Sequence, residues 1–329
     1  DLELKRKGKD DTLESVLMSN PQPDLVIDSF VNMTGTKQAG VFTDLNPFVK
    51  KYNFDLKRID PNVIELIKNY SNDGELYAIP FFMNFTVLWY NRDIFDKFGV
   101  PYPKDDSLWS DIVDLARKVT KVEGGVQYRG LDAGGITQLA WPLGVGYVDR
   151  KTSAPMIEQW KPAYEMLQTV ISIPGNFPAG SKWRDLDAFI KSKTVAMLNE
   201  GNIIQSLVDS GWNGWDLVTT PQYPDHRGTS GAQGGRALII NRTSAHKDDA
   251  FRVIETVLTD AVQTELVKSG QLSPLIDRKL LSSFGVNIPA LQGKNIEAIF
   301  KLPTGYRPIS DYDGDVSAIV LKRADDLVA

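Results

Sequence analysis

Apolar and polar positions follow each other along the chain with two periods, one helical and one typical of buried strands. Across residues 105–121, large apolar residues recur at spacings of four, three and four, which predicts a helix capped by Asp106 or Ser107. The same periodicity predicts helices at 61–70, 157–171 and 247–269, the last closed by Gly270. Amphipathic helices are therefore a main component of the predicted fold.

Short apolar runs between these helices predict buried strands. They lie at 24–30, 194–199, 215–220 and 236–241. Strands that alternate with helices indicate an α/β protein built on mostly parallel sheets. No repeat and no low-complexity linker interrupts the pattern. Two lobes joined by several crossing strands are therefore expected, rather than separate domains on a tether.

The stretch AIPFFMNFTVLWYNRDIFDKFGVPYP, residues 78–103, combines many aromatics with an abrupt polar stop. Its apolar run Phe85–Tyr90 predicts a buried strand, and we assign its aromatic side chains mostly to the core. Asn84 lies at the edge of that run as an embedded amide, and a buried amide without partners would cost about 1–3 kcal/mol. We therefore expect Asn84 to bond either a ligand or neighbouring backbone, and the chain to change lobe near Arg92–Phe95.

Composition excludes several classes of protein. The net charge of −5 gives no reason to expect nucleic acid as a partner, because such binding needs a concentrated basic face. The absence of cysteine excludes disulfides, a thiolate nucleophile and cysteine-ligated zinc. No apolar run approaches the roughly 18–20 residues that span a bilayer. The first residues do not resemble a signal peptide, so export would imply a targeting segment that has been removed.

Motifs of catalysis or metal binding are sparse. His226 and His246 have no partner at a metal-ligand spacing, and no Gly-x-Ser-x-Gly elbow occurs. The glycine-rich loop 231–236 precedes a strand, which does not fit a phosphate-binding loop. The acidic run 311–315 has its glycine two places early for a calcium loop, and Lys322 stands where the closing glutamate is needed. No metal and no cofactor are therefore expected.

Several segments, in the same order, carry a family resemblance. GELYAIP at 74–80, LWYNRDIF at 88–95 and KFGVP at 97–101 resemble extracellular solute-binding proteins, the substrate receptors of ABC importers, in the family of the maltose-binding protein. PDLV at 23–26, AFIKSKTVAM at 188–197 and the strand and helix of 236–266 are similar to further segments of that family. Ser192 departs from the family pattern, which often has glycine there.

The resemblance implies a two-lobed α/β fold, each lobe a mostly parallel sheet flanked by helices, with crossing segments and the ligand cleft between the lobes. The N-lobe would comprise 1–93 plus 237–289. The C-lobe would comprise 94–236 plus 290–329. By comparison with the family, the chain is expected to lack the first strand and the last helix.

The resemblance also implies a function. The protein would capture a sugar or oligosaccharide by hinge closure and deliver it to the membrane permease of an ABC importer. It would be a monomer outside the cytoplasm, either periplasmic or tethered to the cell membrane as a lipoprotein, and not an enzyme. Two alternatives stay open: a polyamine, metal or peptide ligand, and a glycoside-active enzyme. The enzyme would need only two carboxylates such as Glu200 and Asp311.

Candidate ligand contacts lie in loops that follow strands, where aromatic faces can stack on sugar C–H groups and polar side chains can bond hydroxyls. The resemblance and these loops together select Phe30, Asn32, Asn84, Gln138, Trp141, Asn199, Glu200, Asn202, Gly234, Gly235, Tyr306, Asp311 and Tyr312. For each of them an ordinary structural role is the alternative, such as a packed ring, an amide bonded to backbone or a first-turn glutamate. The content of seven tryptophans and eleven tyrosines favours an oligosaccharide over a polyamine.

Overall fold

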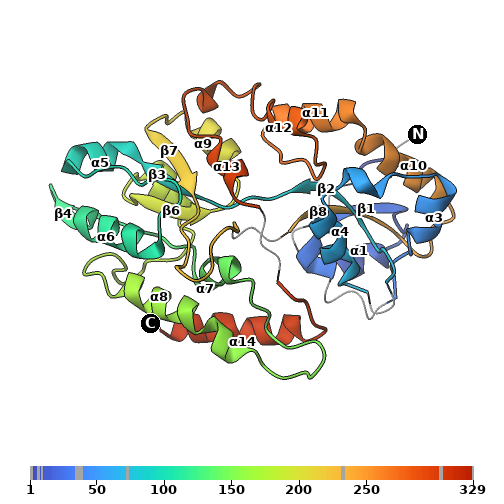
Figure 1. Ribbon diagram of the computed structural model, residues 1–329, viewed down its shortest axis with the longest axis horizontal. Helices are drawn as coiled ribbons and strands as arrows, with labels where there is room; N and C mark the ends of the chain where they lie inside the picture. Colours follow the sequence, from blue (N-terminus) through green and yellow to red (C-terminus); the bar gives the residue numbers. More distant parts are fainter. Residues whose placement is uncertain are drawn as a thin grey trace. The chain divides into compact units, whose positions relative to one another are not determined.

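The computed structural model describes residues 3–5, 8, 10–33, 40–71, 74–230, 234–303 and 307–327. The chain divides into two compact units, each made of two stretches of sequence (Figure 1). Unit 1 comprises Asp1–Met83 and Gly234–Asn287, and unit 2 comprises Asn84–Gln233 and Ile288–Ala329. The predicted lobes, 1–93 plus 237–289 and 94–236 plus 290–329, stay a prediction beside these two units.

Unit 1 is built on a three-stranded sheet in the order β1-β8-β2. β1 (Leu25–Ser29) and β2 (Ile79–Met83) both run antiparallel to β8 (Gly235–Ile240), which lies between them. At Gly235 a Cβ atom would lie 2.2 Å from the carbonyl oxygen of Phe82. Glycine therefore allows β8 to approach the backbone of β2 at this point.

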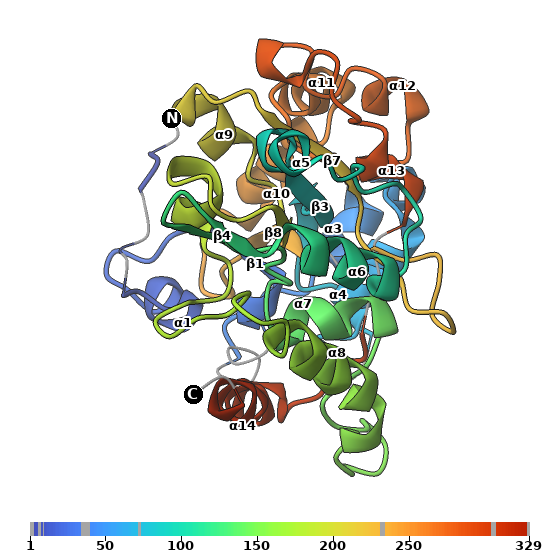
Figure 2. The same ribbon diagram turned by 90° about the vertical axis from the view of Figure 1, so that its left-hand side faces the viewer.

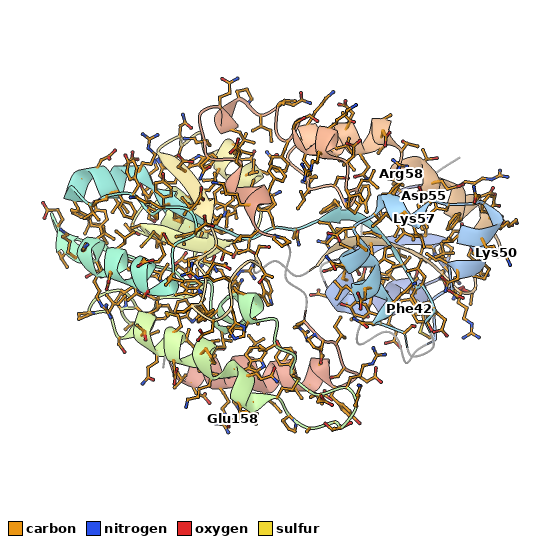
Figure 3. All side chains as sticks on the ribbon, in the orientation of Figure 1. Phe42, Lys50, Asp55, Lys57, Arg58 and Glu158 are labelled. Carbon is orange, nitrogen blue, oxygen red and sulfur yellow. The ribbon has the colours of Figure 1, made fainter. Side chains whose placement is uncertain are left out.

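The helical segments of unit 1 are α1 (Leu13–Leu17), η1 (Phe30–Asn32), α3 (Asn46–Lys51), η3 (Leu56–Arg58), α4 (Pro61–Lys68), α10 (Lys247–Val257), α11 (Asp260–Lys268) and α12 (Arg278–Leu281). Phe251 of α10 is fully buried, and its ring stacks with those of Phe48 and Tyr52 at centroid distances of 5.6 and 5.5 Å. Lys50 and Arg58 lie on the exposed surface of the unit (Figure 3). An aromatic cluster therefore packs α10 against α3 in unit 1.

The single helix predicted over 247–269 is instead two helices, α10 and α11, because Leu258 and Thr259 leave the helical conformation. Thr259 has extended dihedral angles and Asp260 follows it, which together form a helix start that the periodicity obscured. The break changes which side chains face the core. In α11 Gln263 and Val267 are buried, whereas Ala261 is exposed and Leu266 is half-buried.

Unit 2 is built on a sheet in the order β6-β3-β7. β3 (Val87–Asn91) runs antiparallel to both β6 (Met197–Glu200) and β7 (Trp215–Thr219). β6 and β7 are therefore parallel to each other, and α9 (Ile204–Ser210) connects them as in a βαβ unit. Residues 129–132 extend this sheet beside β6 through two parallel bridges.

The prediction of mostly parallel sheets is wrong for the strand pairs of the described residues, which are antiparallel. Strands joined by a helix do share a direction, as β6 and β7 show. In each unit, however, one strand from a distant part of the sequence is inserted between them: β8 in unit 1 and β3 in unit 2. The alternation of apolar and polar residues along the chain predicts the connecting helix, but it does not indicate that a distant strand is inserted between the two it joins.

Besides α9, the helical segments described in unit 2 are α5 (Arg92–Phe98), α6 (Trp109–Val119), α7 (Ile136–Ala140), η4 (Trp141–Leu143), η5 (Ile157–Trp160), α8 (Lys161–Ile171), the π-helix η6 (Asp187–Lys191), η7 (Pro289–Leu291), α13 (Ala298–Lys301) and α14 (Asp313–Asp326). A hairpin of β4 (Lys121–Glu123) and β5 (Val126–Tyr128) completes the unit. α14 lies alongside α8 in both views (Figures 1 and 2), where the Tyr164 hydroxyl donates to the Val320 carbonyl at 3.1 Å. Within the described parts of the chain, no helix combines the length and the apolar character of a membrane span.

The aromatic stretch 78–103 divides differently from its prediction. The buried strand is confirmed as β3, and Phe85, Trp89 and Tyr90 are core residues. Asn84 is exposed and lies outside both strands, so the prediction of an embedded amide is wrong. The chain leaves unit 1 at Met83, before β3, because β3 pairs with strands of unit 2.

Candidate functional site

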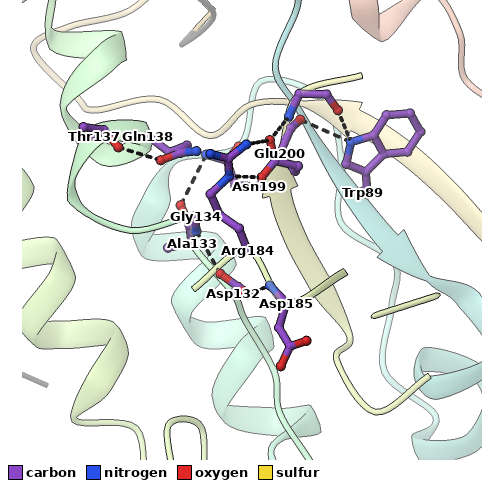
Figure 4. Close-up of polar contacts among 11 residues, drawn as sticks. Trp89, Asp132, Ala133, Gly134, Thr137, Gln138, Arg184, Asp185, Asn199 and Glu200 are labelled. Atoms are coloured by element: carbon purple, nitrogen blue, oxygen red, sulfur yellow. Dashed lines mark hydrogen bonds and ion pairs between the residues drawn. The ribbon is translucent and has the colours of Figure 1, made fainter. Parts of the chain in front are cut away.

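The carboxyl end of β6 carries the most developed polar cluster of unit 2, and a buried tryptophan holds its backbone in place. Trp89 of β3 is fully buried, and its indole Nε1 donates to the carbonyl oxygens of Glu200 at 3.2 Å and Gly201 at 3.0 Å. Because these carbonyls belong to the turn that ends β6, the indole fixes the turn relative to the sheet (Figure 4). The position of the Glu200 carboxylate is thereby set by the core.

The Glu200 carboxylate forms a bidentate ion pair with Arg184. Arg184 Nη2 donates to Glu200 Oε1 at 2.8 Å and Arg184 Nε donates to Oε2, while the amide of Gly201 donates to Oε1 at 2.7 Å. The hydrogen bonds to Glu200 raise the pKa of Arg184. Glu200 is buried, whereas 57% of the Arg184 side chain is exposed, so the guanidinium is the part of the pair that meets solvent.

Gln138 completes this row of side chains (Figure 4). The side-chain amide lies between the Thr137 hydroxyl, 2.9 Å away, and Arg184 Nε. The orientation that satisfies both neighbours turns the amide oxygen toward Arg184, where it accepts from Nε at 3.2 Å, and the amide nitrogen toward Thr137. Gln138 is 1% exposed, so it acts from behind the guanidinium rather than at the surface. Arg184 is therefore held on two sides, by a carboxylate and by a buried amide.

A second buried carboxylate, Asp132, holds the backbone under this row. Its oxygens accept from the amides of Gly134 and Asp185, each at 3.0 Å. Burial raises the pKa of Asp132, and these hydrogen bonds and the Arg129 charge oppose that shift. Arg184 itself has a φ of 56°, a conformation that non-glycine residues rarely adopt. Asp132 thus ties together the Gly134 turn and the strained Arg184 backbone.

A fixed aromatic pair precedes Arg184 in the sequence. The rings of Phe177 and Trp183 lie 4.3 Å apart between centroids, and the Arg129 guanidinium lies 5.2 Å above the Phe177 ring. Both rings are half-buried, so part of each faces solvent. A cavity of about 550 Å³ adjoins them and is lined by Phe177, Pro178, Ala179, Gly180, Ser181, Lys182, Trp183 and Asp325.

Unit 1 has a smaller polar cluster at the carboxyl end of β1. Asp28 is buried, and its Oδ1 accepts from the amide of Ser29 at 2.7 Å and from Nδ2 of Asn32 at 2.8 Å. Arg236 Nη1 lies 3.5 Å from the same oxygen, with 48% of the Arg236 side chain exposed. Asn32 therefore belongs to this cluster.

Three predicted contacts have structural roles instead. Phe30 is fully buried in unit 1 and offers no ring face to a ligand. Asn199 is also fully buried, and its side chain accepts from the Thr220 hydroxyl at 2.9 Å and donates to the Ala133 carbonyl at 3.5 Å. Gly235 admits a close approach of neighbouring backbone, as described above. The sequence pattern identified polar and aromatic residues near strand ends but not the side of the sheet on which each one lies.

The other predicted contacts are at or near the surface. Trp141 and Asn202 are half-buried, and Asn202 Oδ1 accepts from the amide of Ile204 at 3.1 Å. Tyr312 is 53% exposed, and its neighbour Asp311 is exposed as well. Gly234 has a φ of +106°, which suits glycine at the start of β8. Tyr306 lies outside the described residues.

Four residues of the cluster were not predicted from the sequence: Arg129, Asp132, Trp183 and Arg184. Trp-Arg-Asp at 183–185 follows a loop rich in glycine, proline and serine, which is the available sequence signal. Pairing with Glu200 across 16 positions is visible only in the structure. Within the described ranges, no group of three or more histidine, aspartate or glutamate side chains is arranged to hold a metal ion.

The two-unit architecture and the surface cluster at a strand end define a class of protein, the two-lobed solute-binding proteins. A family model described as "Bacterial extracellular solute-binding protein" matches residues 9–264, and the chain belongs to this family. The recognised family and its two-lobed fold are thus confirmed.

Individual relatives are distant. The sn-glycerol-3-phosphate-binding periplasmic protein UgpB of Brucella abortus is 24% identical over 263 residues, which cover 74% of this chain and 59% of that protein. The chain thus spans about three-fifths of the length of this curated relative. An arabinooligosaccharide-binding protein of Bacillus subtilis is 35% identical over 81 residues, or 25% of this chain and 17% of that protein.

Solved structures support the fold over almost the whole chain. A sugar transporter protein of Rhizobium etli in an open conformation superposes with a TM-score of 0.76 at 22% identity, covering 95% of this chain and 82% of that one. An ABC substrate-binding protein of Listeria monocytogenes, in complex with cycloalternan, superposes with a TM-score of 0.73 at 18% identity. The match covers 93% of this chain and 80% of that one. These likenesses establish the architecture.

Proposed function

We propose that this protein captures a sugar or oligosaccharide outside the cytoplasm by hinge closure and delivers it to the permease of an ABC importer. The observation that carries the proposal is the surface of unit 2 at Trp183 and Arg184. There a half-exposed indole precedes an exposed guanidinium that is paired with Glu200. Sugars need such a combination, because their C–H faces stack on rings and their hydroxyls bond planar charged groups.

The proposal extends what relatives bind. Solved relatives include proteins described as bound to mannotriose, maltose and cycloalternan. The family to which the chain belongs is described as extracellular solute-binding proteins. We propose that this protein is either periplasmic or tethered to the cell membrane by a lipid anchor. We further propose that the protein acts as a monomer, which light scattering after gel filtration would test.

The glycoside-active alternative is less favoured by the site. A catalytic carboxylate must release a proton or reach the sugar as a nucleophile or base, whereas the Glu200 carboxylate is buried and accepts hydrogen bonds from Arg184 and Gly201. Incubation with oligosaccharides followed by a reducing-sugar assay tests this point. Turnover would contradict the receptor function.

A melting-temperature screen tests the ligand class. The panel contains maltose, mannotriose, arabinotriose and tagatose, together with sn-glycerol 3-phosphate and spermidine as charged probes. A ligand at about 100 times its Kd adds about 2.7 kcal/mol to the stability of the folded state, which raises the melting temperature by several degrees. We expect a shift with at least one neutral sugar. A shift with spermidine alone would overturn the sugar assignment.

Delivery to an importer is tested separately. Ligand-loaded protein is added to membranes or vesicles that contain the cognate permease, and ATP hydrolysis is measured. Stimulation by the loaded protein and not by the ligand alone is the expected result, because the importer must distinguish the ligand-bound form.

A further inference from the structure

The exposed guanidinium of Arg184 is already engaged by a carboxylate. Arginine has five N–H donors, and a phosphate or carboxylate ligand is bound best by two parallel ones. Glu200 occupies such an edge, because it accepts from both Nε and Nη2. With its amide oxygen turned toward Arg184, Gln138 also accepts from Nε at 3.2 Å. An anionic ligand would therefore have to displace Glu200 or bind beside its negative charge.

Two cations near Arg184 also lie close to a carboxylate. Arg129 Nη1 and Lys182 Nζ each lie 3.8 Å from the carboxylate of Asp185. Unit 1 repeats the arrangement, since the half-exposed Arg236 lies 3.5 Å from the buried Asp28. In the Arg184–Glu200 and Arg236–Asp28 pairs, a buried carboxylate thus neutralises an arginine that faces solvent.

We propose that Glu200 is a specificity-determining residue that commits the Arg184 surface to uncharged polyhydroxy ligands and excludes phosphate esters. This inference rests on the proposed function, because it assigns the ligand class of the same surface. A neutral hydroxyl can use the guanidinium donors that Glu200 leaves unbonded and does not repel the carboxylate. A phosphate monoester gains too little from a neutralised arginine to offset the loss of its hydration.

The inference separates this chain from its relatives named for sn-glycerol 3-phosphate. A phosphate monoester would need a free edge of the Arg184 guanidinium. Glu200 removes that edge and is itself fixed, because the Gly201 amide donates to its carboxylate and Trp89 holds the turn. The carboxylate cannot swing away without breaking its hydrogen bonds from the Gly201 amide and from Arg184.

Glu200→Gln is the direct test, since it keeps the size of the side chain and removes its charge. Binding of sn-glycerol 3-phosphate and of inorganic phosphate is measured by calorimetry at constant ionic strength. We expect no binding by the wild type up to about 10 mM and a gain of at least about tenfold in affinity in Glu200→Gln, as expected for a charge-assisted bond to a freed arginine. Arg184→Gln in the Glu200→Gln background should abolish the gain.

Lys182→Gln in the same background is the matched control. It removes a cation from the same loop, but one that does not bond Glu200. The gain should persist in this control. A gain that disappears equally with Lys182→Gln would be a general charge effect and would overturn the inference, as would the absence of any gain in a folded Glu200→Gln protein.

The wild type provides a test that does not depend on the folding of a variant. If wild-type protein binds either phosphate probe at millimolar concentration and Arg184→Gln removes that binding, Glu200 does not exclude anions and the inference is wrong. These experiments need no sugar. Failure of the phosphate gain while a sugar still binds refutes the inference alone, whereas a phosphate gain without binding of any sugar refutes the proposed function alone.

Discussion

Replacing Asp132 with asparagine tests the buried carboxylate beneath the site. The Asp132 oxygens accept from the amides of Gly134 and Asp185, each at 3.0 Å, and the side chain is fully buried. Asparagine has one acceptor oxygen, so its amide nitrogen would face one of these N–H groups. A hydrogen bond to a charged group contributes about 1.5–3 kcal/mol, and an unpaired buried N–H costs about 1–3 kcal/mol.

Part of this loss is offset, because the asparagine side chain carries no charge to desolvate. We therefore expect Asp132→Asn to lower the free energy of unfolding by about 2–4 kcal/mol. Urea denaturation followed by circular dichroism and tryptophan fluorescence measures the change. Asp187→Asn is the control, because Asp187 is an exposed carboxylate in the adjacent π-helix, paired with Lys191 at the surface.

The control should stay within about 0.5 kcal/mol of the wild type. Equal midpoints for wild type and Asp132→Asn would refute the clamp role of Asp132. An equally large loss in Asp187→Asn would show that the loop, rather than the buried carboxylate, sets the effect. Ligand affinity of Asp132→Asn should also fall, because Arg184 would lose the backbone support of the neighbouring amide.

The stability of the wild type relative to Asp132→Asn should depend on pH. Burial raises the pKa of Asp132 above its ordinary value of 3.8, so the folded state binds the proton more tightly than the unfolded chain. The stabilising contribution of Asp132 protonation is fully present below the ordinary pKa of 3.8 and is lost as the pH rises through the higher folded-state pKa. The difference in unfolding free energy between the two proteins should therefore shrink from acid pH upward. A difference that grows with pH would contradict the raised pKa.

Three further changes test other parts of the site. Trp183→Ala should weaken binding of the best sugar in the panel by at least about tenfold, since aromatic stacking is lost, whereas Lys182→Gln should leave it within about threefold; calorimetry compares the two. Gly134→Ala should lower the free energy of unfolding by about 2–4 kcal/mol, because the φ of Gly134 is +81° and a Cβ would lie 2.6 Å from the carbonyl oxygen of Asn199. Gly124→Ala should lower it by only about 1–2 kcal/mol in the same urea assay, because Gly124 has a φ of +57° but open space around it. Trp89→Phe should cost about 1–3 kcal/mol through the lost indole donor and loosen the Glu200 turn, which amide hydrogen exchange at Gly201 would detect.

The cluster also explains why the protein can share a fold with binders of different chemistry. The sheet and the Trp89 contact fix where the turn after β6 lies. We propose that the side chains on that turn and on the loop 177–185 decide what is bound. One substitution at Glu200 changes the charge of the surface without touching the core. Specificity in this fold is therefore a property of side chains that the scaffold only positions.

Several features could be predicted from the sequence because they depend on neighbours along the chain. The helices at 61–70 and 157–171 and the strand at 85–90 follow from the local spacing of apolar residues, and they occur as α4, η5 with α8, and β3. Ordered short motifs were enough to recognise the family, which the match over 9–264 confirms. These signals need no knowledge of which strand lies beside which.

Tertiary structure alone decided the rest, because it depends on groups that are far apart in sequence. β3 and β8 are inserted between strands that share a direction, which turned predicted parallel pairs into antiparallel ones. Asn199 and Glu200 are adjacent on β6, yet one bonds Thr220 in the interior and the other bonds Arg184 toward the surface. Successive side chains of a strand point to opposite faces, and only the packing of the whole sheet determines which face is buried and which one meets the ligand.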